Sequence, residues 1–245
     1  TNQEASYDIL VSFSPTISQY MAVSKWVESE LSARVRNKKI TRLYPLTTQN
    51  PTPSVHNYNR RLKLVYASRL TNVDKEALRL IPLIKALLIS GLTFSFDIYG
   101  DGPCRNAIQD FLDSLELADS NITLHGDQPK QIIERAFSKG DIFVSLASKE
   151  GFGMAIAEAM SARLVPVVMR FDGGICELLK DGDDSILVDQ EDFDAFAGKI
   201  AELDKNRKLL RKTKDNARKN IKVFQDEKFF FRSFREIAEA CFREK

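Results

Sequence analysis

The stretch DIFVSLASKEGFGMAIAEAMSA, residues 141–162, joins a strand pattern to a helix pattern through a glycine turn. Residues 141–147 form a short apolar run typical of a buried strand, and residues 154–162 are good helix formers. Glu150 precedes the turn and Glu158 follows eight residues later. Glycines let the backbone approach a ligand, and the first amides of a helix can bind an anion. The stretch therefore predicts a phosphate site between two carboxylates, although the spacing alone equally fits an ordinary helix start.

The same alternation continues on both sides of this stretch. Further strands are predicted at residues 62–67, 93–99, 122–125, 165–169 and 185–188. Helices are predicted between and after them, at residues 74–90, 103–117, 129–137, 174–179 and 192–203. Strands that alternate with helices imply right-handed crossovers and a parallel sheet. We therefore expect an α/β fold, a Rossmann-like doubly wound parallel sheet with helices on both faces, over residues 61–203.

The segments before residue 61 and after residue 203 do not continue the regular alternation of strands and helices. Strands are predicted at residues 7–14, 20–23 and 39–44, with a helix at 24–33 that Ser24 caps. Residues 47–60 are polar, contain two prolines and have no period, so they read as a linker after a first unit of residues 1–46. Two more helices, at 206–222 and 227–243, make up a last unit of residues 204–245. A kink is expected near Pro82, and Pro103 is expected at a first helical position.

Composition excludes several classes of protein. The 245 residues are 43% hydrophobic and 29% charged, with a net charge of +2, which fits a globular protein and gives no general case for nucleic-acid binding. Three widely spaced cysteines and two histidines predict neither a disulfide framework nor a metal site, and they favour the reducing cytoplasm. Cys104 stands at a predicted helix start, which would lower its thiol pKa, but it has no histidine partner.

Ligands of doubly wound sheets bind at the carboxyl ends of the strands, where four other loops lie. The first loop carries Arg69 and Lys75, two cations suited to a diphosphate, although a plain surface pair is the simpler reading. The next loop contains Gly100 and Gly102, which could line a nucleotide cleft, although an ordinary turn is the simpler reading. A further loop contains Gly126, whose backbone could contact a base, next to His125, which is expected to be structural. The last loop has the pair Gly173 and Gly174, whose amides could reach the hydroxyls of a sugar. A GxGxxG fingerprint after the first strand is absent, which argues against a dehydrogenase.

Taken together, these motifs resemble the nucleotide-binding half of the retaining GT-B glycosyltransferases of the bacterial group 1 (GT4) family. The resemblance runs from about Tyr20 to Leu203. It rests on residues 20–24, 40–45, 68–70 with Lys75, the GxGP turn at 100–103, the E-x7-E motif at 150–158 and the glycine pair followed by Glu at 171–177. Glu76 and Arg163 stand where the family often has glycine. A first domain of comparable size is reduced here to residues 1–33.

The resemblance assigns a role to each motif. Arg69, Lys75 and Glu150 become catalytic residues: the two cations stabilise the departing diphosphate without a metal ion or other cofactor, and the carboxylate contacts the transferred sugar. Glu158 holds the ribose hydroxyls. The amides of Phe152, Gly153 and Met154 contact the sugar or the β-phosphate. The remaining glycines line the substrate site; they are Gly100, Gly102, Gly126, Gly173 and Gly174.

The resemblance implies transfer of a sugar from a UDP- or GDP-linked donor to an acceptor, with retention of configuration. The acceptor would be a glycan, a lipid-linked sugar or a protein, in bacterial polysaccharide biosynthesis. Two alternatives stay open. One is a non-catalytic nucleotide-sugar-binding subunit, or a donor domain inactive without its acceptor domain. The other, a sugar-nucleotide epimerase, lacks candidate acid and base groups.

Basic residues gather after Leu203, among them Arg211, Lys212, Arg218 and Lys219. They raise the hypothesis of peripheral contact with anionic lipid at the inner face of the membrane. A solvated helix face is the simpler alternative. Phe230, Phe234, Ile237 and Cys241 give the last predicted helix an apolar stripe for packing.

Overall fold

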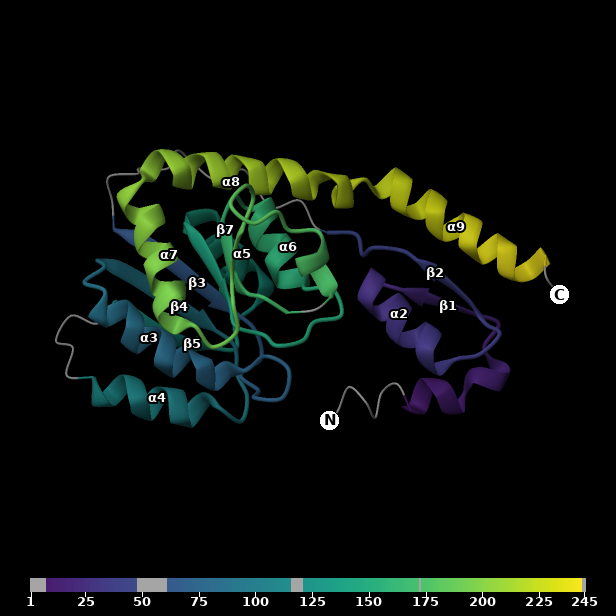
Figure 1. The fold of residues 1–245 in the computed structure, drawn as a ribbon, viewed down its shortest axis with the longest axis horizontal. Coiled ribbons are helices and arrows are strands. Elements are labelled where there is room, and N and C mark those ends of the chain that lie inside the picture. The colour runs from purple at the N-terminus through teal and green to yellow at the C-terminus, as the bar shows by residue number, and fades with distance from the viewer. Residues whose placement is uncertain (1–7, 48–60, 116–120, 172, 244–245) are drawn as a thin grey trace.

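A computed structural model describes residues 8–47, 61–115, 121–171 and 173–243 of the chain. These residues form a large α/β part and a small part that lies beside it (Figure 1). The strands of the large part are β3 (Leu62–Ala67), β4 (Phe94–Tyr99), β5 (Ile122–Gly126), β6 (Ile142–Ser145), β7 (Val165–Met169) and β8 (Ile186–Val188). They form one sheet in the order β5-β4-β3-β6-β7-β8, and every pair is parallel.

Helices cover both faces of this sheet (Figure 1). One face carries α3 (Leu80–Ile89), α4 (Arg105–Ser114) and α7 (Phe193–Lys205), and the other carries α5 (Lys130–Lys139), α6 (Met154–Ser161) and α8 (Arg207–Ile221). Along β3, Leu64 and Tyr66 enter the first core, whereas Val65 and Ala67 enter the second. Burial on both faces explains why these strands read as continuous apolar runs. The expected α/β class, a parallel sheet between two layers of helices, is confirmed.

The order of the strands places a crevice at the middle of the sheet. From β3 the chain moves outward through β4 to β5, then returns to β6 on the other side of β3 and moves outward again. The loops that follow β3 and β6 therefore leave the same sheet edge in opposite directions. Such a switch point is where open α/β sheets bind ligands.

The small part is a two-stranded parallel sheet with one helix packed on it. Its elements are β1 (Gln19–Ala22), β2 (Lys39–Arg42) and α2 (Lys25–Arg34). Ser24 caps the helix as predicted, since its Oγ accepts a hydrogen bond from the Val27 N–H at 3.2 Å. Helix α9 (Glu227–Arg243) runs alongside this part (Figure 1), and the Cys241 thiol donates to Gln19 Oε1 at 2.9 Å.

Three details of the sequence interpretation are wrong. Residues 8–12 are helical and lead into a 3-10 turn, η1 (Ser14–Thr16), so the strand predicted at 7–14 does not form. Backbone bonds such as Phe13 N–H to Ile9 O at 3.2 Å satisfy this segment locally. The helix predicted at 74–90 starts late, with η2 (Ala77–Arg79) and then α3, so Pro82 lies in the first turn of α3 and is not a mid-helix kink. Pro103 precedes α4, which begins at Arg105.

The remaining boundaries agree within a few residues. The predicted helix at 174–179 is a single 3-10 turn, η3 (Gly174–Glu177), and another such turn, η4 (Lys222–Gln225), separates α8 from α9. Helix α8 packs on α6 and β7, so its inner residues belong to the core of the large part. Most of the predicted linker, residues 48–60, lies outside the described residues. Within the part of the chain that the structure describes, no helix is both long and apolar enough to cross a membrane.

Candidate functional site

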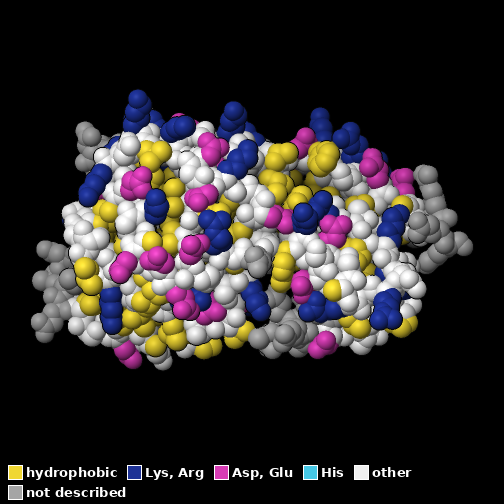
Figure 2. Space-filling model, in the orientation of Figure 1, with side chains coloured by type: hydrophobic (Ala, Val, Ile, Leu, Met, Phe, Trp, Pro, Cys, Tyr) yellow, Lys and Arg dark blue, Asp and Glu magenta, His cyan; other side chains and the backbone are white. Residues whose placement is uncertain are grey.

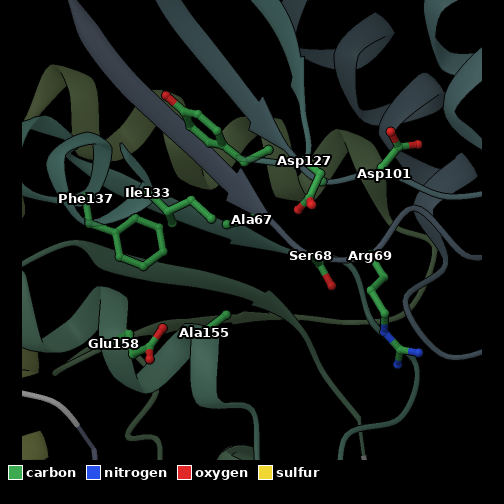
Figure 3. Close-up of a pocket in the computed structure, with 11 residues that line it drawn as sticks. Ala67, Ser68, Arg69, Asp101, Asp127, Ile133, Phe137, Ala155 and Glu158 are labelled. Atoms are coloured by element: carbon green, nitrogen blue, oxygen red, sulfur yellow. The ribbon is translucent and has the colours of Figure 1, made fainter. Parts of the chain in front are cut away.

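A cavity of about 520 Å³ opens at the carboxyl ends of β3 and β4, next to α6. Its walls come from the loops after β3, β4 and β5 and from α5 and α6; they are formed by Ala67, Ser68, Arg69, Tyr99, Gly100, Asp101, Asp127, Ile133, Phe137, Ala155 and Glu158. In Figure 3, Glu158 and Ala155 of α6 lie across the cavity from Asp101 and Asp127. The volume is in the range of small-molecule sites.

Arg69 and Lys75 are both engaged by carboxylates near this cavity. Arg69 Nη2 lies 2.7 Å from Asp74 Oδ2, and its side chain is largely exposed at the rim. Lys75 Nζ forms an ion pair with Glu150 Oε1, and both of these side chains are mostly buried. The structure thus brings together the three residues predicted to be catalytic around one corner of the sheet edge.

The loops that carry Lys75 and Glu150 are bound to each other by two more contacts. Ser148 N–H donates to the Asp74 carbonyl at 3.1 Å. The Ser148 hydroxyl donates to Glu76 Oε1 at 2.8 Å. Glu76 has a φ of 49°, in the left-handed region that favours glycine. Ser148 thereby fixes the distance between the two loops.

The turn between β6 and α6 has the predicted form. Gly153 precedes α6 with a φ of 101°, and the helix begins at Met154. The amides of Met154 and Ala155 therefore have no carbonyl within the helix, whereas Ile156 N–H donates to the Gly153 carbonyl at 3.1 Å. Phe152 is buried, and its ring packs against Tyr44 and Phe224. Only the backbone of Phe152 is therefore available to a ligand. Met154 is partly exposed at the start of α6.

Glu158 lies about one turn beyond Met154 in α6 and forms part of the cavity wall. Lys130, the first residue of α5, places its Nζ 3.6 Å from Glu158 Oε1. The two carboxylates of the motif consequently occupy different places. Glu150 lies with Lys75 at the sheet edge, and Glu158 lies in the wall of the 520 Å³ cavity.

Gly100 and Gly102 serve backbone packing. A Cβ on Gly100 would lie 1.9 Å from the Ser68 carbonyl oxygen, and one on Gly102 would lie 2.6 Å from the Leu70 carbonyl oxygen. Gly100 also forms part of the cavity wall, whereas Gly102 does not. Only glycine permits the loop after β4 to approach the loop that carries Arg69 this closely.

Gly126 lies outside the cavity wall. Its carbonyl accepts a hydrogen bond from Gly100 N–H at 2.8 Å, and the Arg105 guanidinium packs on its Cα. His125 is engaged by neighbouring side chains: its Nε2 lies 2.7 Å from Asp97 Oδ1, and its ring stacks on Tyr99 at a centroid distance of 4.5 Å. Its structural role stays a prediction. Burial, and secondarily the Asp97 carboxylate, raises the pKa of Tyr99 to about 12.

Gly173 and Gly174 are not part of the cavity wall. Gly173 packs against Trp26 of α2, and Gly174 packs against the carbonyls of Glu150 and Phe152. Both have positive φ, 92° and 57°, which only glycine adopts readily. Their predicted contact with ligand hydroxyls stays a prediction.

The structure changes the interpretation of Cys104 and of Arg163. Burial raises the pKa of the Cys104 thiol, so the predicted lowering at a helix start is wrong. Arg163, which had no explanation in the sequence, has a φ of 67° at the end of α6 and forms an ion pair with Asp215 of α8. Among the described residues, no three His, Cys, Asp or Glu side chains are grouped to hold a metal ion.

Several cavity residues were not identified from the sequence. Asp101 and Asp127 follow the ends of β4 and β5, and that position after a strand was the available signal. Ile133 and Phe137 come from α5, where their spacing of four predicts only a buried face. Asp74 lies between Arg69 and Lys75 in sequence, but its partner can be known only from the structure.

The fold and the motifs define the class of protein, and the family comparison agrees. The chain belongs to the family described as glycosyl transferases group 1, whose model matches residues 51–220. It is 27% identical over 208 residues to the uncharacterized glycosyltransferase MJ1178 of Methanocaldococcus jannaschii, covering 85% of this chain and 56% of that protein.

Two further similarities are informative. The chain is 30% identical over 132 residues to the N-acetyl-alpha-D-glucosaminyl L-malate synthase of Bacillus anthracis, which covers 54% of this chain and 34% of that enzyme. A variant of S. aureus TarM, solved with fondaparinux, alpha-GlcNAc-glycerol and UDP, superposes with a TM-score of 0.85 at 17% identity. The superposition covers 95% of this chain and 46% of TarM, and it shows the shared GT-B fold. The chain thus spans about half, or less, of the length of these proteins.

Proposed function

We propose that this chain binds a nucleoside-diphosphate sugar and forms the donor side of a glycosyltransferase that acts with retention of configuration. The observation that carries the proposal is the convergence of Lys75, Glu150 and Arg69 at one corner of the sheet edge, next to a cavity with Glu158 in its wall. Cations for a diphosphate and separate carboxylates for two hydroxylated rings are the groups that such a donor requires.

The proposed chemistry follows from this arrangement. When the bond between the anomeric carbon and the β-phosphate oxygen breaks, negative charge builds up on the leaving diphosphate. Arg69 and Lys75 stabilise that charge, and the amides at the start of α6 add hydrogen bonds. Glu150 binds the sugar and Glu158 binds the ribose. No metal ion is assigned a role. Retention is proposed on the family resemblance.

The proposed donor is linked to UDP or GDP. Support for UDP comes from TarM, which has the same fold and was solved with UDP bound. We propose that the acceptor is a glycan, a lipid-linked sugar or a protein, in polysaccharide biosynthesis. Contacts to the acceptor are assigned to the part of the relatives that this chain does not span.

Thermal-shift measurements with a panel of UDP, GDP and their sugar conjugates test the proposal. A ligand that binds the native state raises the melting temperature according to its affinity. We expect one nucleotide and its sugar conjugates to raise it in the wild type and in Lys199→Met, an exposed lysine of α7, but not in Lys75→Met. If no member of the panel shifts the wild type, the proposal fails.

A non-catalytic donor-binding chain is the second candidate. It is favoured by one finding: the chain spans only 56% and 34% of the two relatives described above. A donor titration next to a turnover assay separates the candidates. Binding without transfer to any glycan acceptor supports the second, whereas transfer by this chain alone supports the first.

We also propose peripheral contact with the inner face of a membrane through α8 and α9. Figure 2 shows Lys and Arg side chains along the edge formed by these helices, and Val223, Phe229 and Phe231 are exposed there. Basic groups beside exposed apolar groups suit an anionic bilayer. Co-sedimentation with phosphatidylserine vesicles should fall as salt rises and should be absent with phosphatidylcholine vesicles. Equal recovery under all conditions would exclude the contact.

A further inference from the structure

The small and large parts of the protein meet at the loop after β7, and Glu177 lies at the point of contact. Its Oε1 accepts hydrogen bonds from the Lys25 backbone N–H at 2.8 Å and from the Tyr44 hydroxyl at 3.3 Å. Lys25 is the first residue of α2. Because the first N–H groups of a helix lack partners within it and carry partial positive charge, a carboxylate there stabilises the helix end. The side chain of Glu177 thus binds the small part to the large one.

The backbones on either side of this contact are close to each other. A Cβ on Gly173 would lie 2.2 Å from Trp26 Cγ, so the indole ring of α2 rests directly on the loop. Beside it, a Cβ on Gly151 would lie 3.8 Å from Val23 Cγ2. The small part therefore touches the 173–177 loop, and Val23 lies near the turn that follows Glu150.

The same loop also holds the segment that carries Glu150. Ile175 N–H donates to the Phe152 carbonyl at 2.5 Å. A Cβ on Gly174 would lie 2.7 Å from the Glu150 carbonyl oxygen. The 173–177 loop is consequently held between α2 on one side and the backbone of the candidate site on the other.

We propose that Glu177 is a positioning residue: by holding the start of α2 against the 173–177 loop, it keeps Glu150 and the turn after it in place at the donor site. The joint between the two parts and the donor site are then energetically coupled. Because such coupling is reciprocal, donor binding must also tighten the joint. This inference rests on the proposed function for the identity of the ligand, but not for the existence of the joint.

Trp26 provides a direct test, because it is the only tryptophan of the chain and it lies in the joint. We suggest measuring acrylamide quenching of its fluorescence in wild type, Glu177→Ala, Glu177→Gln and the matched control Glu202→Gln, an exposed glutamate of α7. Each protein is measured without ligand and with saturating UDP-glucose, UDP-N-acetylglucosamine or GDP-mannose. Calorimetry gives the affinity for the same nucleotide sugars, and circular dichroism gives the melting temperature.

We expect Glu177→Ala to raise the quenching constant about two-fold without ligand and to weaken nucleotide-sugar binding about five- to twenty-fold, since the hydrogen bonds from Lys25 N–H and the Tyr44 hydroxyl to its carboxylate are lost. Glu177→Gln keeps an oxygen acceptor for Lys25 N–H, so it should restore most of both properties. Nucleotide sugar should protect Trp26 from quenching in the wild type and in Glu202→Gln, but not in Glu177→Ala. Melting temperatures of all four proteins should agree within about 4 °C, because the lost helix-end contact is worth about 1 kcal/mol.

Two results would overturn the inference. Quenching in Glu177→Ala that equals the control would show that Glu177 does not hold the joint. Raised quenching with unchanged nucleotide-sugar affinity would show that the joint does not position the site. If the wild type binds none of the nucleotide sugars, the proposed function fails instead, and the comparison of quenching without ligand still decides the role of Glu177 in the joint.

Discussion

Lys75 and Glu150 form an ion pair between two loops that lie 75 residues apart in the sequence and next to each other at the sheet edge. The Lys75 side chain is 13% exposed and that of Glu150 is 20% exposed. Partial burial reduces the screening of such a pair by water and salt. A cation assigned to the diphosphate and a carboxylate assigned to the sugar are therefore electrostatically coupled, and a change in one alters the binding properties of the other.

Glu150→Gln should affect two ligands in opposite directions. Removing the carboxylate leaves Lys75 without its counter-ion, so the nucleoside diphosphate should bind a few-fold more tightly. The nucleotide sugar should bind more weakly, by about ten-fold, because a hydrogen bond to a charged group is lost. Calorimetry with UDP and with a UDP-sugar measures both. Parallel changes for the two ligands would contradict a sugar contact by Glu150.

Arg69→Ala and Asp74→Asn should differ in their effect on diphosphate binding. Arg69 is bound to Asp74, and Thr71 Oγ1 also donates to that carboxylate at 2.8 Å. Loss of one charge-assisted hydrogen bond, worth about 1.5–3 kcal/mol, should weaken diphosphate binding about ten- to a hundred-fold in Arg69→Ala. Asp74→Asn should tighten it or leave it unchanged, since it frees the guanidinium. Weaker binding in Asp74→Asn would mean that Asp74 is needed to orient Arg69.

Glu158→Ala should weaken the binding of nucleotides but not that of inorganic pyrophosphate. The carboxylate lies in the cavity wall, away from the Lys75–Glu150 pair. UDP binding should fall about ten-fold through the lost ribose contact, and pyrophosphate binding should stay within about two-fold of the wild type. Competition titrations give both affinities. Equal loss for both ligands would exclude the ribose role.

The sequence predicts the strand–helix order of the large part well, because each apolar run and each glycine turn is a local signal. Glu150, Lys75 and Arg69 were predicted to meet because the carboxyl ends of parallel strands share one edge. The strand predicted at 7–14 is wrong, because a segment forms a strand only where a neighbouring strand accepts its backbone hydrogen bonds. Residues 8–12 instead form a helix with local backbone hydrogen bonds.

The side-chain partners in the site could not be predicted. Ser148 and Glu177 act through contacts that the fold creates between distant segments, and Asp74 pairs with Arg69 only because of the conformation of the loop that they share. The same holds for the glycine turns, whose tight backbone contacts depend on the approach of neighbouring loops. A residue pattern indicates which groups reach a sheet edge, and the packing of the loops determines which of them bind each other.

At Arg163, backbone strain and an ion pair make opposite contributions to the free energy of unfolding. Its φ of 67° is unfavourable for a residue with a Cβ, by about 1–2 kcal/mol. The ion pair with Asp215, which is 54% exposed, offsets part of that cost. Arg163→Gly should therefore leave the free energy of unfolding within about 1 kcal/mol of the wild type, whereas Arg163→Ala keeps the strain, loses the pair and should be the less stable variant. Urea denaturation of both variants checks this order, and a more stable alanine variant would contradict it.

Lys214 ties α8 to the sheet from within the core. Its Nζ lies 3.0 Å from Asp141 Oδ1 and 3.0 Å from the Gly140 carbonyl oxygen, and its side chain is 0% exposed. The other carboxylate oxygen, Asp141 Oδ2, accepts a hydrogen bond from Lys63 N–H at 3.0 Å, at the start of β3. One carboxylate thus connects a helix and two neighbouring strands.

Lys214→Met should lower the free energy of unfolding by about 3–5 kcal/mol, because it leaves Asp141 charged and buried without its cation. Lys212→Met, on the exposed face of the same helix, is the matched control and should change it by less than about 0.5 kcal/mol. Urea denaturation monitored by circular dichroism measures both. Adding Asp141→Asn to Lys214→Met removes the buried charge that Lys214 had balanced, so the double variant should recover part of the loss. A double variant less stable than Lys214→Met alone would show that the Asp141–Lys63 bond, and not the ion pair, dominates the stability of this contact.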